Sequence, residues 1–167
     1  TRIKGITIMD GVKDLTIKGV DFDIAGIKLA NVENVTISNC SFFLASNIAS
    51  QTGSLVKNLI IKDCKFTNIM DNLTSAIKIL EYDGLTVENC EFDNIYDSCV
   101  THQGGKAYGI PKNITIKNNS FSNYGMAAYE IRDKVTLNTV FSGNFCDLAG
   151  EGISVQSDER PRNSEIY

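Results

Sequence analysis

Hydrophobic and polar positions alternate along several short stretches of this chain, and the alternation recurs within a nine-residue unit. Neighbouring copies of the unit begin 20 to 29 residues apart. Self-similarity at this spacing is typical of a repeat protein. The copies are DLTIKGVDF (14–22), NVTISNCSF (34–42), NLIIKDCKF (58–66), GLTVENCEF (84–92), NITIKNNSF (113–121) and the degraded NTVFSGNFC (138–146).

Each unit predicts a strand, a bend and a second short strand. Positions two and four are aliphatic in the five clearer copies, while positions three and five are mostly Thr, Ser, Lys or Glu, so the first strand buries one face. Position nine is Phe in those five copies and is expected to point inward after the bend. Position six holds residue types that tolerate the positive φ of a sharp bend. These residues are Gly19, Asn39, Asp63, Asn89, Asn118 and Gly143.

A third strand is predicted between consecutive units, because alternation returns at 26–31, 75–80, 98–103, 127–133 and 151–158, and weakly at 46–50. Each coil then reads strand, bend, short strand, loop, strand, loop. Like positions stack only if the chain winds in parallel. The prediction is an all-β fold, a single-stranded right-handed parallel β-helix of about six coils, in which neighbouring coils supply the core. A leucine-rich repeat is disfavoured because its L-x-x-L-x-L frame is absent.

Length and charge limit the domain count and the partners. The 167 residues suit one domain, 1–167, with 43% hydrophobic residues to form a core. A net charge of −4 argues against nucleic acid as a partner. No apolar run approaches the roughly 20 residues that span a bilayer. The first residues lack both a signal-peptide pattern and an initiator Met, so we expect a processed piece of a longer chain, and secretion stays open.

Cysteines recur at position seven of the unit, where Cys40, Cys64 and Cys90 are equivalent. Cys99 lies between units, and Cys146 falls two places later in the degraded copy. With no C-x-x-C pair and only one histidine, a zinc site is disfavoured. We expect a stack of buried thiols that behave as small hydrophobes, although spacing alone leaves a disulfide between neighbouring repeats open.

The units VENVTISNCSF, VKNLIIKDCKF and PKNITIKNNSF make the chain, over residues 5–158, similar to the pectin-lyase-like superfamily of right-handed parallel β-helices. That superfamily includes polysaccharide lyases, pectin hydrolases, epimerases, phage tailspikes and adhesins. The resemblance therefore implies the fold but leaves the activity to be argued from a site. It also implies a groove that binds an extended sugar chain along one sheet, flanked by the longer loops.

The strands between units are the best candidates for this groove. Alternation places Lys28, Lys78, Thr101, Glu130 and Ser154 in one outward row, and Ala30, Leu80, Gln103, Arg132 and Gln156 in the next. The candidate substrate-binding residues are Lys28, Lys78, Gln103, Lys106, Glu130, Arg132 and Gln156. Lys106 belongs to the longest insertion, whose glycines suit a loop over the sheet. Arg132 and His102 are the catalytic candidates, although a one-residue shift would change which way His102 points.

The last coil, EGISVQS (151–157), is similar to a strand that chondroitinase-B-like alginate and dermatan lyases use. The resemblance implies a calcium ion held by Glu151. Gln156 stands where those enzymes have the basic lysine, and Gln cannot accept a proton. No pair of carboxylates at matching positions of adjacent coils suggests a hydrolase couple.

Two functions are compatible with these features. One is a polysaccharide-binding β-helix of a secreted or surface carbohydrate-active protein, extending to a lyase that cleaves an acidic, uronic-acid polysaccharide by β-elimination. The other is a non-catalytic structural or adhesion β-helix, as in a tailspike or adhesin on a cell or virion surface. Exposed strand edges at both ends predict a longer β-helix or a homo-oligomer, as a trimer or an end-to-end stack.

Overall fold

The computed structural model describes residues 1–8, 10–70, 74–102, 109–132 and 136–147, together with the backbone of 151–156 and 165–166. Every regular element in this part of the chain is a strand, as predicted. None of the described residues forms a helix of the length and apolarity that crossing a bilayer requires. The strands form three sheets of seven strands each.

The sheets are named here A, B and C. Sheet A contains β1 (Arg2–Ile3), β4 (Asp21–Phe22), β7 (Ser41–Phe43), β10 (Lys65–Ile69), β13 (Glu91–Ile95), β16 (Ser120–Tyr124) and β19 (Phe145–Cys146). Sheet B contains β2 (Ile6–Ile8), β5 (Ile27–Leu29), β8 (Ile48–Ser50), β11 (Ile77–Lys78), β14 (Val100–Thr101), β17 (Ala127–Arg132) and β20 (Glu151–Gln156). Sheet C contains β3 (Lys13–Lys18), β6 (Glu33–Ser38), β9 (Val56–Lys62), β12 (Tyr82–Glu88), β15 (Lys112–Lys117), β18 (Leu137–Ser142) and β21 (Glu165–Ile166).

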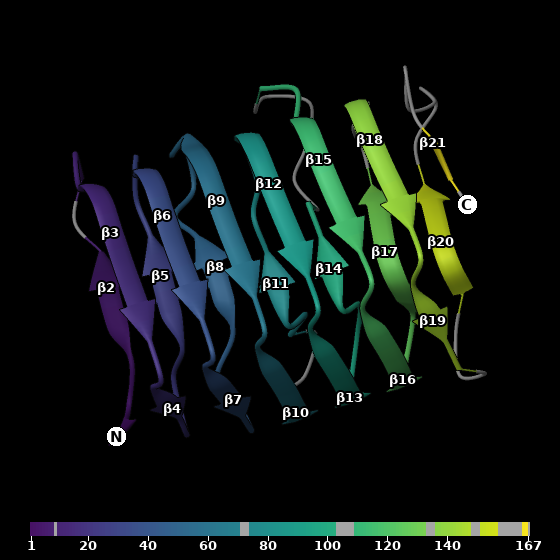
Figure 1. Ribbon diagram of the computed structural model, residues 1–167, viewed down its shortest axis with the longest axis horizontal. Coiled ribbons are helices and arrows are strands. Elements are labelled where there is room, and N and C mark those ends of the chain that lie inside the picture. Colours follow the sequence, from purple (N-terminus) through teal and green to yellow (C-terminus); the bar gives the residue numbers. More distant parts are fainter. Residues whose placement is uncertain are drawn as a thin grey trace.

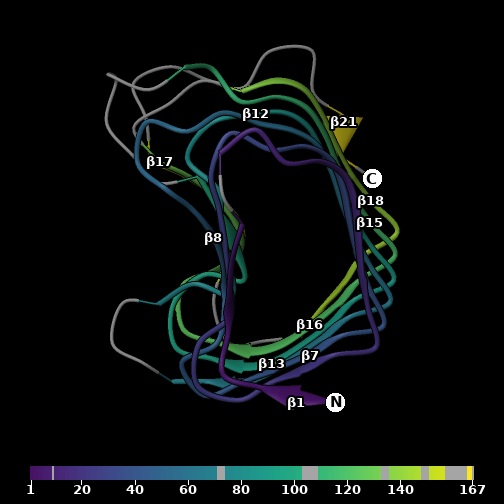
Figure 2. The same cartoon turned by 90° about the vertical axis from the view of Figure 1, so that its left-hand side faces the viewer.

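The chain visits the sheets in turn, so each strand pairs in parallel with the strand three places later (Figure 1). Equivalent positions of the repeat lie side by side: Thr36 pairs with Thr16 and Ile60, and Phe66 pairs with Phe42 and Phe92. Viewed along its axis, the backbone forms a coil around the core, with sheet B on one side and the junction of sheets C and A on the other (Figure 2). The predicted parallel β-helix is confirmed.

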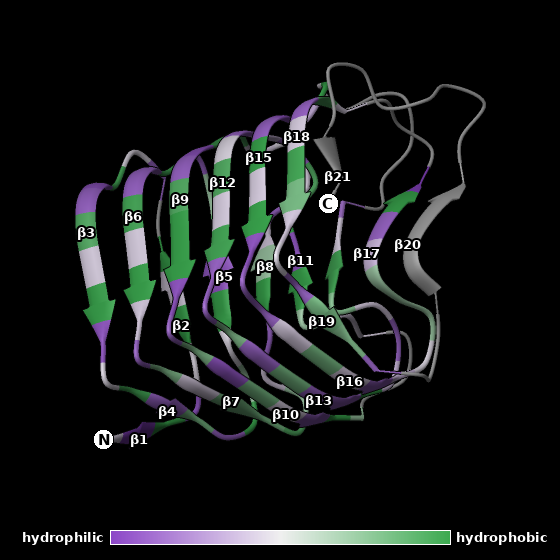
Figure 3. Ribbon diagram, turned by 45° about the vertical axis from the view of Figure 1, so that its right-hand side comes forward, coloured by the Kyte–Doolittle hydropathy of each residue, from purple (hydrophilic) through white to green (hydrophobic). Residues whose placement is uncertain are grey.

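The core consists of columns of equivalent side chains that run along the axis. Hydrophobic segments recur at the same level in neighbouring strands of sheet C (Figure 3). The clearest column is formed by the phenylalanines at position nine, all fully buried, with ring centroids 4.6–4.8 Å apart. Each ring fills the space beneath the next, so no single coil has a core of its own. The column contains Phe22, Phe42, Phe66, Phe92 and Phe121.

The predicted bend is present in all six copies, because every residue at position six has φ between 51° and 67°. The sequence analysis overlooked position one, which has positive φ in all six copies as well. There the carboxamides bond across coils: Asn34 Nδ2 donates to Asp14 Oδ1 at 2.9 Å, and Asn58 Nδ2 donates to Asn34 Oδ1 at 2.9 Å. The side-chain amide thus ties the bends of adjacent coils together. The residues at position one are Asp14, Asn34, Asn58, Gly84, Asn113 and Asn138.

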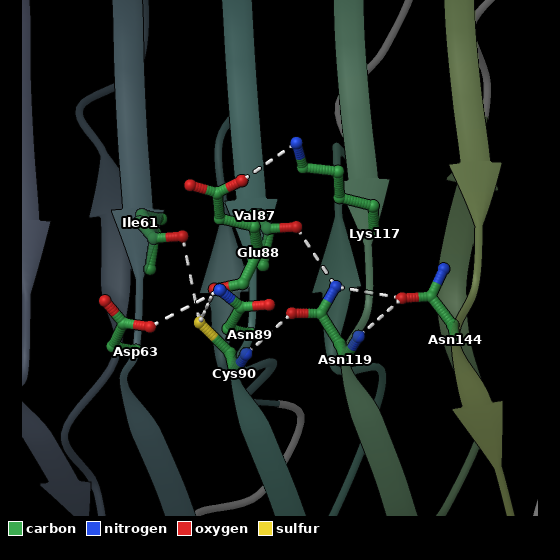
Figure 4. A network of polar contacts seen from close by, with 9 residues as sticks. All are labelled: Ile61, Asp63, Val87, Glu88, Asn89, Cys90, Lys117, Asn119 and Asn144. Carbon is green, nitrogen blue, oxygen red and sulfur yellow. Dashed lines mark hydrogen bonds and ion pairs between the residues drawn. The ribbon is translucent and has the colours of Figure 1, made fainter.

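Position seven forms a second inter-coil column at the corner between sheets C and A (Figure 4). All five cysteines are free, and four of them are buried, which confirms the predicted stack of thiols. The thiols also act as donors: Cys90 Sγ bonds to the carbonyl of Ile61 in the preceding coil at 3.7 Å. Asn119 takes over this role in the next coil, where its Nδ2 donates to the carbonyl of Val87 at 3.0 Å. A thiol and an amide therefore satisfy equivalent carbonyls.

Candidate functional site

The outward row predicted on sheet B has the expected register. Lys28 pairs with Ala49, Ala49 with Lys78, and Lys78 with Thr101. Thr101 then pairs with Glu130, and Glu130 with Ser154. The strands follow one another at about 4.8 Å, so the row places one side chain per coil along a straight line.

Exposure along this row differs between its two ends. Lys28 is exposed and Lys78 is half-buried, as a solvated groove requires. Thr101 and Glu130, however, are only 2% and 1% exposed, although both belong to the outward row. The expectation of a fully solvated row is therefore wrong at these two positions. Alternation predicts which face a residue occupies, but it does not predict what packs over that face.

Glu130 is held by hydroxyl groups from the preceding coil. Ser98 Oγ and Thr101 Oγ1 both donate to Glu130 Oε2, at 3.1 Å and 2.8 Å. The other oxygen, Oε1, lies 4.0 Å from Arg132 Nη1 and accepts no hydrogen bond among the described residues. A buried carboxylate is costly unless it is compensated. Glu130 therefore draws the half-exposed guanidinium of Arg132 toward the outer face of sheet B.

His102 lies on the inner side of the coil and is fully buried. Its Nδ1 is 3.2 Å from the hydroxyl of Tyr82, and its ring centroid is 5.7 Å from that of Tyr129. Tyr129 pairs with Val100, which lies two residues before His102, so these side chains share the interior. The orientation that the sequence left open is thus settled, and His102 does not join Arg132 on the outer face.

Several candidates lie outside the described residues. Gln103 and Lys106 are among them, so their place in the groove stays a prediction. Glu151 and Gln156 are described by their backbone alone, where they pair with Ala127 and Arg132 in β17. The described side chains include no cluster of three or more His, Cys, Asp or Glu residues that would hold a metal ion. The calcium site at Glu151 accordingly stays a prediction.

An open groove of about 640 Å³ covers the N-terminal half of sheet B. It is lined by residues of β2, β5 and β8 and by residues that precede each of these strands. Gly26 is necessary here, since a Cβ atom would lie 1.8 Å from the backbone oxygen of Asn47. Neither Lys4 nor Lys28 forms an ion pair with a described residue. The polar lining residues include Lys4, Thr7, Lys28, Asn47 and Ser50.

The loops that join sheet B to sheets A and C extend outward beyond it in the view along the axis (Figure 2). The groove takes its lining from three consecutive coils, so it runs along the axis rather than around one coil. Lys4 and Lys28 line the groove, and Lys78 and Arg132 follow in later strands of sheet B. Such a surface fits an elongated ligand that contacts one coil after another.

Comparison with protein families agrees with this geometry. The family described as the right-handed β-helix region matches residues 4–166. The chain belongs to the right-handed β-helix family. No curated protein and no solved structure matches it. The match establishes the fold and its handedness, while the function has to be argued from the surface of the β-helix.

Two features of this surface were missed by sequence reasoning. The first is the hydroxyl pair of Ser98 and Thr101 beneath Glu130, which depends on contacts between residues 29 and 32 positions apart. The second is the row of Asn, Asp and Gly at position one. Its composition is as uniform as that of position six, so this row was detectable from the aligned units.

Proposed function

We propose that this β-helix binds an extended acidic polysaccharide along the outer face of sheet B. The observation that carries the proposal is the straight row of outward positions, one per coil, that contains Lys28 and Lys78. Two strand spacings, about 9.6 Å, approximate the repeat of a disaccharide. Cations at this interval match a chain that carries a carboxylate on alternate sugars. This ligand class also agrees with the pectin-lyase-like resemblance of the repeat.

Charge supports an acidic ligand at this face despite the net charge of −4. Lys4 and Lys28 line the groove, and Arg132 extends the cationic row toward the C-terminal coils. Glu130 is the described carboxylate in the row. It is buried and already engaged by two hydroxyls, so it does not face the ligand. Glu130 therefore does not oppose the cations of this row.

Binding is favoured over cleavage by the position of His102. β-Elimination needs a base beside the C5 hydrogen of the uronate. His102 is turned into the core, and the ring cannot reach a ligand on the opposite side of its own strand. Arg132 would neutralise a carboxylate but is a poor base because its guanidinium stays protonated. Neither of the two catalytic candidates therefore supplies the base that a lyase reaction needs.

The test measures binding of polygalacturonate, alginate and chondroitin sulfate to the wild type and to Lys28→Gln, Lys78→Gln and their double variant. Each exposed charge pair contributes roughly 0.5–1 kcal/mol, so each single change is expected to weaken binding about two- to fivefold. The affinity should also fall as the salt concentration rises. Absorbance near 235 nm, recorded with calcium present, reports unsaturated products if the protein cleaves.

Lys18→Gln is the matched control, since it removes the same charge from an exposed position on sheet C. It should leave binding unchanged. Equal weakening by Lys18→Gln and Lys28→Gln would mean that net charge, and not the groove, attracts the polymer. If no acidic polysaccharide binds, the alternative of a purely structural β-helix is favoured.

We also propose that the β-helix continues into another β-helical segment or copy. The strands β1, β2 and β3 lie at one edge of their sheets and pair on one side only. Open edges of this kind favour strand addition. Sedimentation over a range of protein concentrations should show association, and a trimer or an end-to-end stack agrees with placement on a secreted protein, a cell surface or a virion.

A further inference from the structure

A second groove lies on the other side of the β-helix, along the corner where sheet C turns into sheet A. It has a volume of about 820 Å³ and crosses four consecutive coils. Because the interior of the coil separates it from sheet B, a ligand bound on sheet B does not occupy it (Figure 2). Five of its twelve lining residues carry a carboxamide or a hydroxyl, namely Asn89, Asn118, Asn119, Ser120 and Ser122.

The outer wall of this corner groove is a row of exposed side chains at position six. Asp63, Asn89 and Asn118 have φ between 53° and 54°, so each presents its side chain in the same way on successive coils. Asn89 Nδ2 lies 3.5 Å from Asp63 Oδ1, which links two of them. A carboxamide offers both a donor and an acceptor. Asn89 and Asn118 therefore present this pair of groups on two successive coils, while Asp63 offers acceptors alone.

The floor of the groove is held in place by hydrogen bonds between amides of successive coils. Asn119 Oδ1 accepts from the backbone N–H of Cys90 at 2.9 Å, while its Nδ2 donates to Val87 O and to Asn144 Oδ1, both at 3.0 Å (Figure 4). Asn144 Nδ2 in turn donates to the carbonyl of Ile116 at 2.9 Å. The outer amides thus stand on a fixed frame, and ordering them on binding costs little entropy.

Phe145 closes one end of the groove and is 64% exposed. It pairs with Ser120 in β16, and the same column holds Glu91 and Lys65 in earlier coils. An aromatic ring therefore stands in water at a position where the preceding coils have polar side chains. Exposed rings beside amides suit a pyranose, whose C–H face packs on the ring while its hydroxyls meet the amides.

The charges of the corner are largely compensated. Lys65 Nζ and Glu91 Oε1 form an ion pair at 2.8 Å, and Lys117 Nζ and Glu88 Oε2 form another at 3.0 Å. Asp63 adds a negative charge to the groove. No cation is left over among the described lining residues to attract a carboxylate or sulfate. The surface therefore selects against the acidic polymer proposed for sheet B.

We propose that the corner groove binds neutral sugar residues of an oligosaccharide, with Phe145 as the stacking platform and Asn89 and Asn118 as hydrogen-bonding partners. This site is independent of the acidic ligand on sheet B. A protein with both grooves would hold two different glycans, or two regions of one mixed glycan, on its two sides. Binding at the corner should be insensitive to salt, because no net charge is neutralised.

The test uses calorimetric titration of the whole chain with neutral hexasaccharides of glucose, mannose, xylose and galactose. Phe145→Ser introduces the residue found at the equivalent position of the preceding coil, and it should weaken binding about tenfold or more. Asn118→Gly removes an amide without backbone strain, since Gly143 has the same conformation in the next coil, and a loss of about fivefold is expected. Ile24→Ser, which removes another exposed hydrophobic residue far along the chain, is the matched control and should change nothing.

Three results would overturn the proposal. One is that none of the four hexasaccharides binds. Another is that Phe145→Ser binds as well as the wild type. The third is that Lys28→Gln, on sheet B, weakens neutral-sugar binding as much as Phe145→Ser does. Sedimentation of Phe145→Ser adds a check on the ring itself: if this variant loses self-association but keeps sugar binding, the corner is an interface between copies. Failure of acidic polysaccharides to bind would leave the corner proposal unaffected.

Discussion

Asn119 carries the sharpest prediction for the stability of the β-helix. The side chain is 3% exposed and joins three coils at the corner between sheets C and A. Asn119→Ala removes the acceptor of the Cys90 N–H and the donor to the Val87 carbonyl. A buried polar group that loses its partner costs about 1–3 kcal/mol, so two such groups predict a loss of about 2–6 kcal/mol.

Urea denaturation followed by far-ultraviolet circular dichroism measures this loss. With a slope near 2 kcal/mol per molar urea, a loss of about 3 kcal/mol lowers the midpoint by about 1.5 M. Asn119→Cys is the informative companion, because Cys90 donates its Sγ to the equivalent carbonyl of the preceding coil. The thiol keeps a weak donor to Val87 but does not replace the oxygen that accepts from the Cys90 N–H, so Asn119→Cys should lose less stability than Asn119→Ala but still more than half as much. Equal midpoints for Asn119→Ala and the wild type would refute the role of the amide.

Asn119→Asp separates the donor from the acceptor. The carboxylate still accepts from the Cys90 N–H, but it places an oxygen opposite the Val87 carbonyl, where the amide now donates at 3.0 Å. Burial and this repulsion should raise the folded-state pKa of the new carboxyl above the roughly 3.9 of an unfolded chain. The variant is then destabilised least below about pH 4 and progressively more as the pH rises through the folded-state pKa. A midpoint difference from the wild type that is the same at pH 4 and pH 7 would contradict the assignment.

Three further predictions concern the repeat itself. Phe66→Ala should lower the free energy of unfolding by about 3–5 kcal/mol. This loss should exceed that of Phe22→Ala by about 0.5–1.5 kcal/mol, because Phe66 stacks on Phe42 and Phe92, whereas Phe22 stacks on Phe42 alone among the described rings and pairs with Ile3 on its other side. Equal urea midpoints for the two variants would argue against ring stacking. Gly19→Ala should cost about 1–2 kcal/mol because Gly19 has positive φ. Gly143→Ala shares this cost and should be more destabilising, since its Cβ atom would also lie 2.5 Å from Oδ1 of Asn118, whereas no atom lies within 4 Å of a Cβ atom at Gly19. Thermal unfolding measures both variants. Burial raises the pKa of Cys99 well above its ordinary value and also raises the pKa of the half-exposed Cys146. Ellman's reagent at pH 8 should therefore label Cys146 first, more slowly than it labels a small-molecule thiol, and should reach the other four cysteines only on unfolding. Rapid labelling of several thiols in the native protein would contradict this prediction.

Local patterns were sufficient to predict the path of the backbone. Period-two alternation identified both faces of the strands, and Gly, Asn or Asp at position six identified the bend, because few other residues adopt positive φ without strain. Once every copy has the same strand and bend, only a parallel coil aligns them. The register of sheet B followed directly, and Lys28, Lys78, Thr101 and Glu130 lie in the predicted row.

Burial and hydrogen bonding across coils were beyond such patterns, because they depend on residues about one coil apart in the chain. Glu130 looks like a solvated side chain in an alternating strand, yet it is enclosed and bonded to Ser98 and Thr101 from the coil before. His102 was ambiguous until the register of β14 placed Val100, and with it the ring, on the inside. Asn119 stands at a position that holds cysteine in the three preceding coils, and only the adjoining carbonyls explain why an amide fits there. Sequence repeats specify which residues become neighbours, whereas solvent exclusion and partner geometry arise only when the neighbouring coils are in contact.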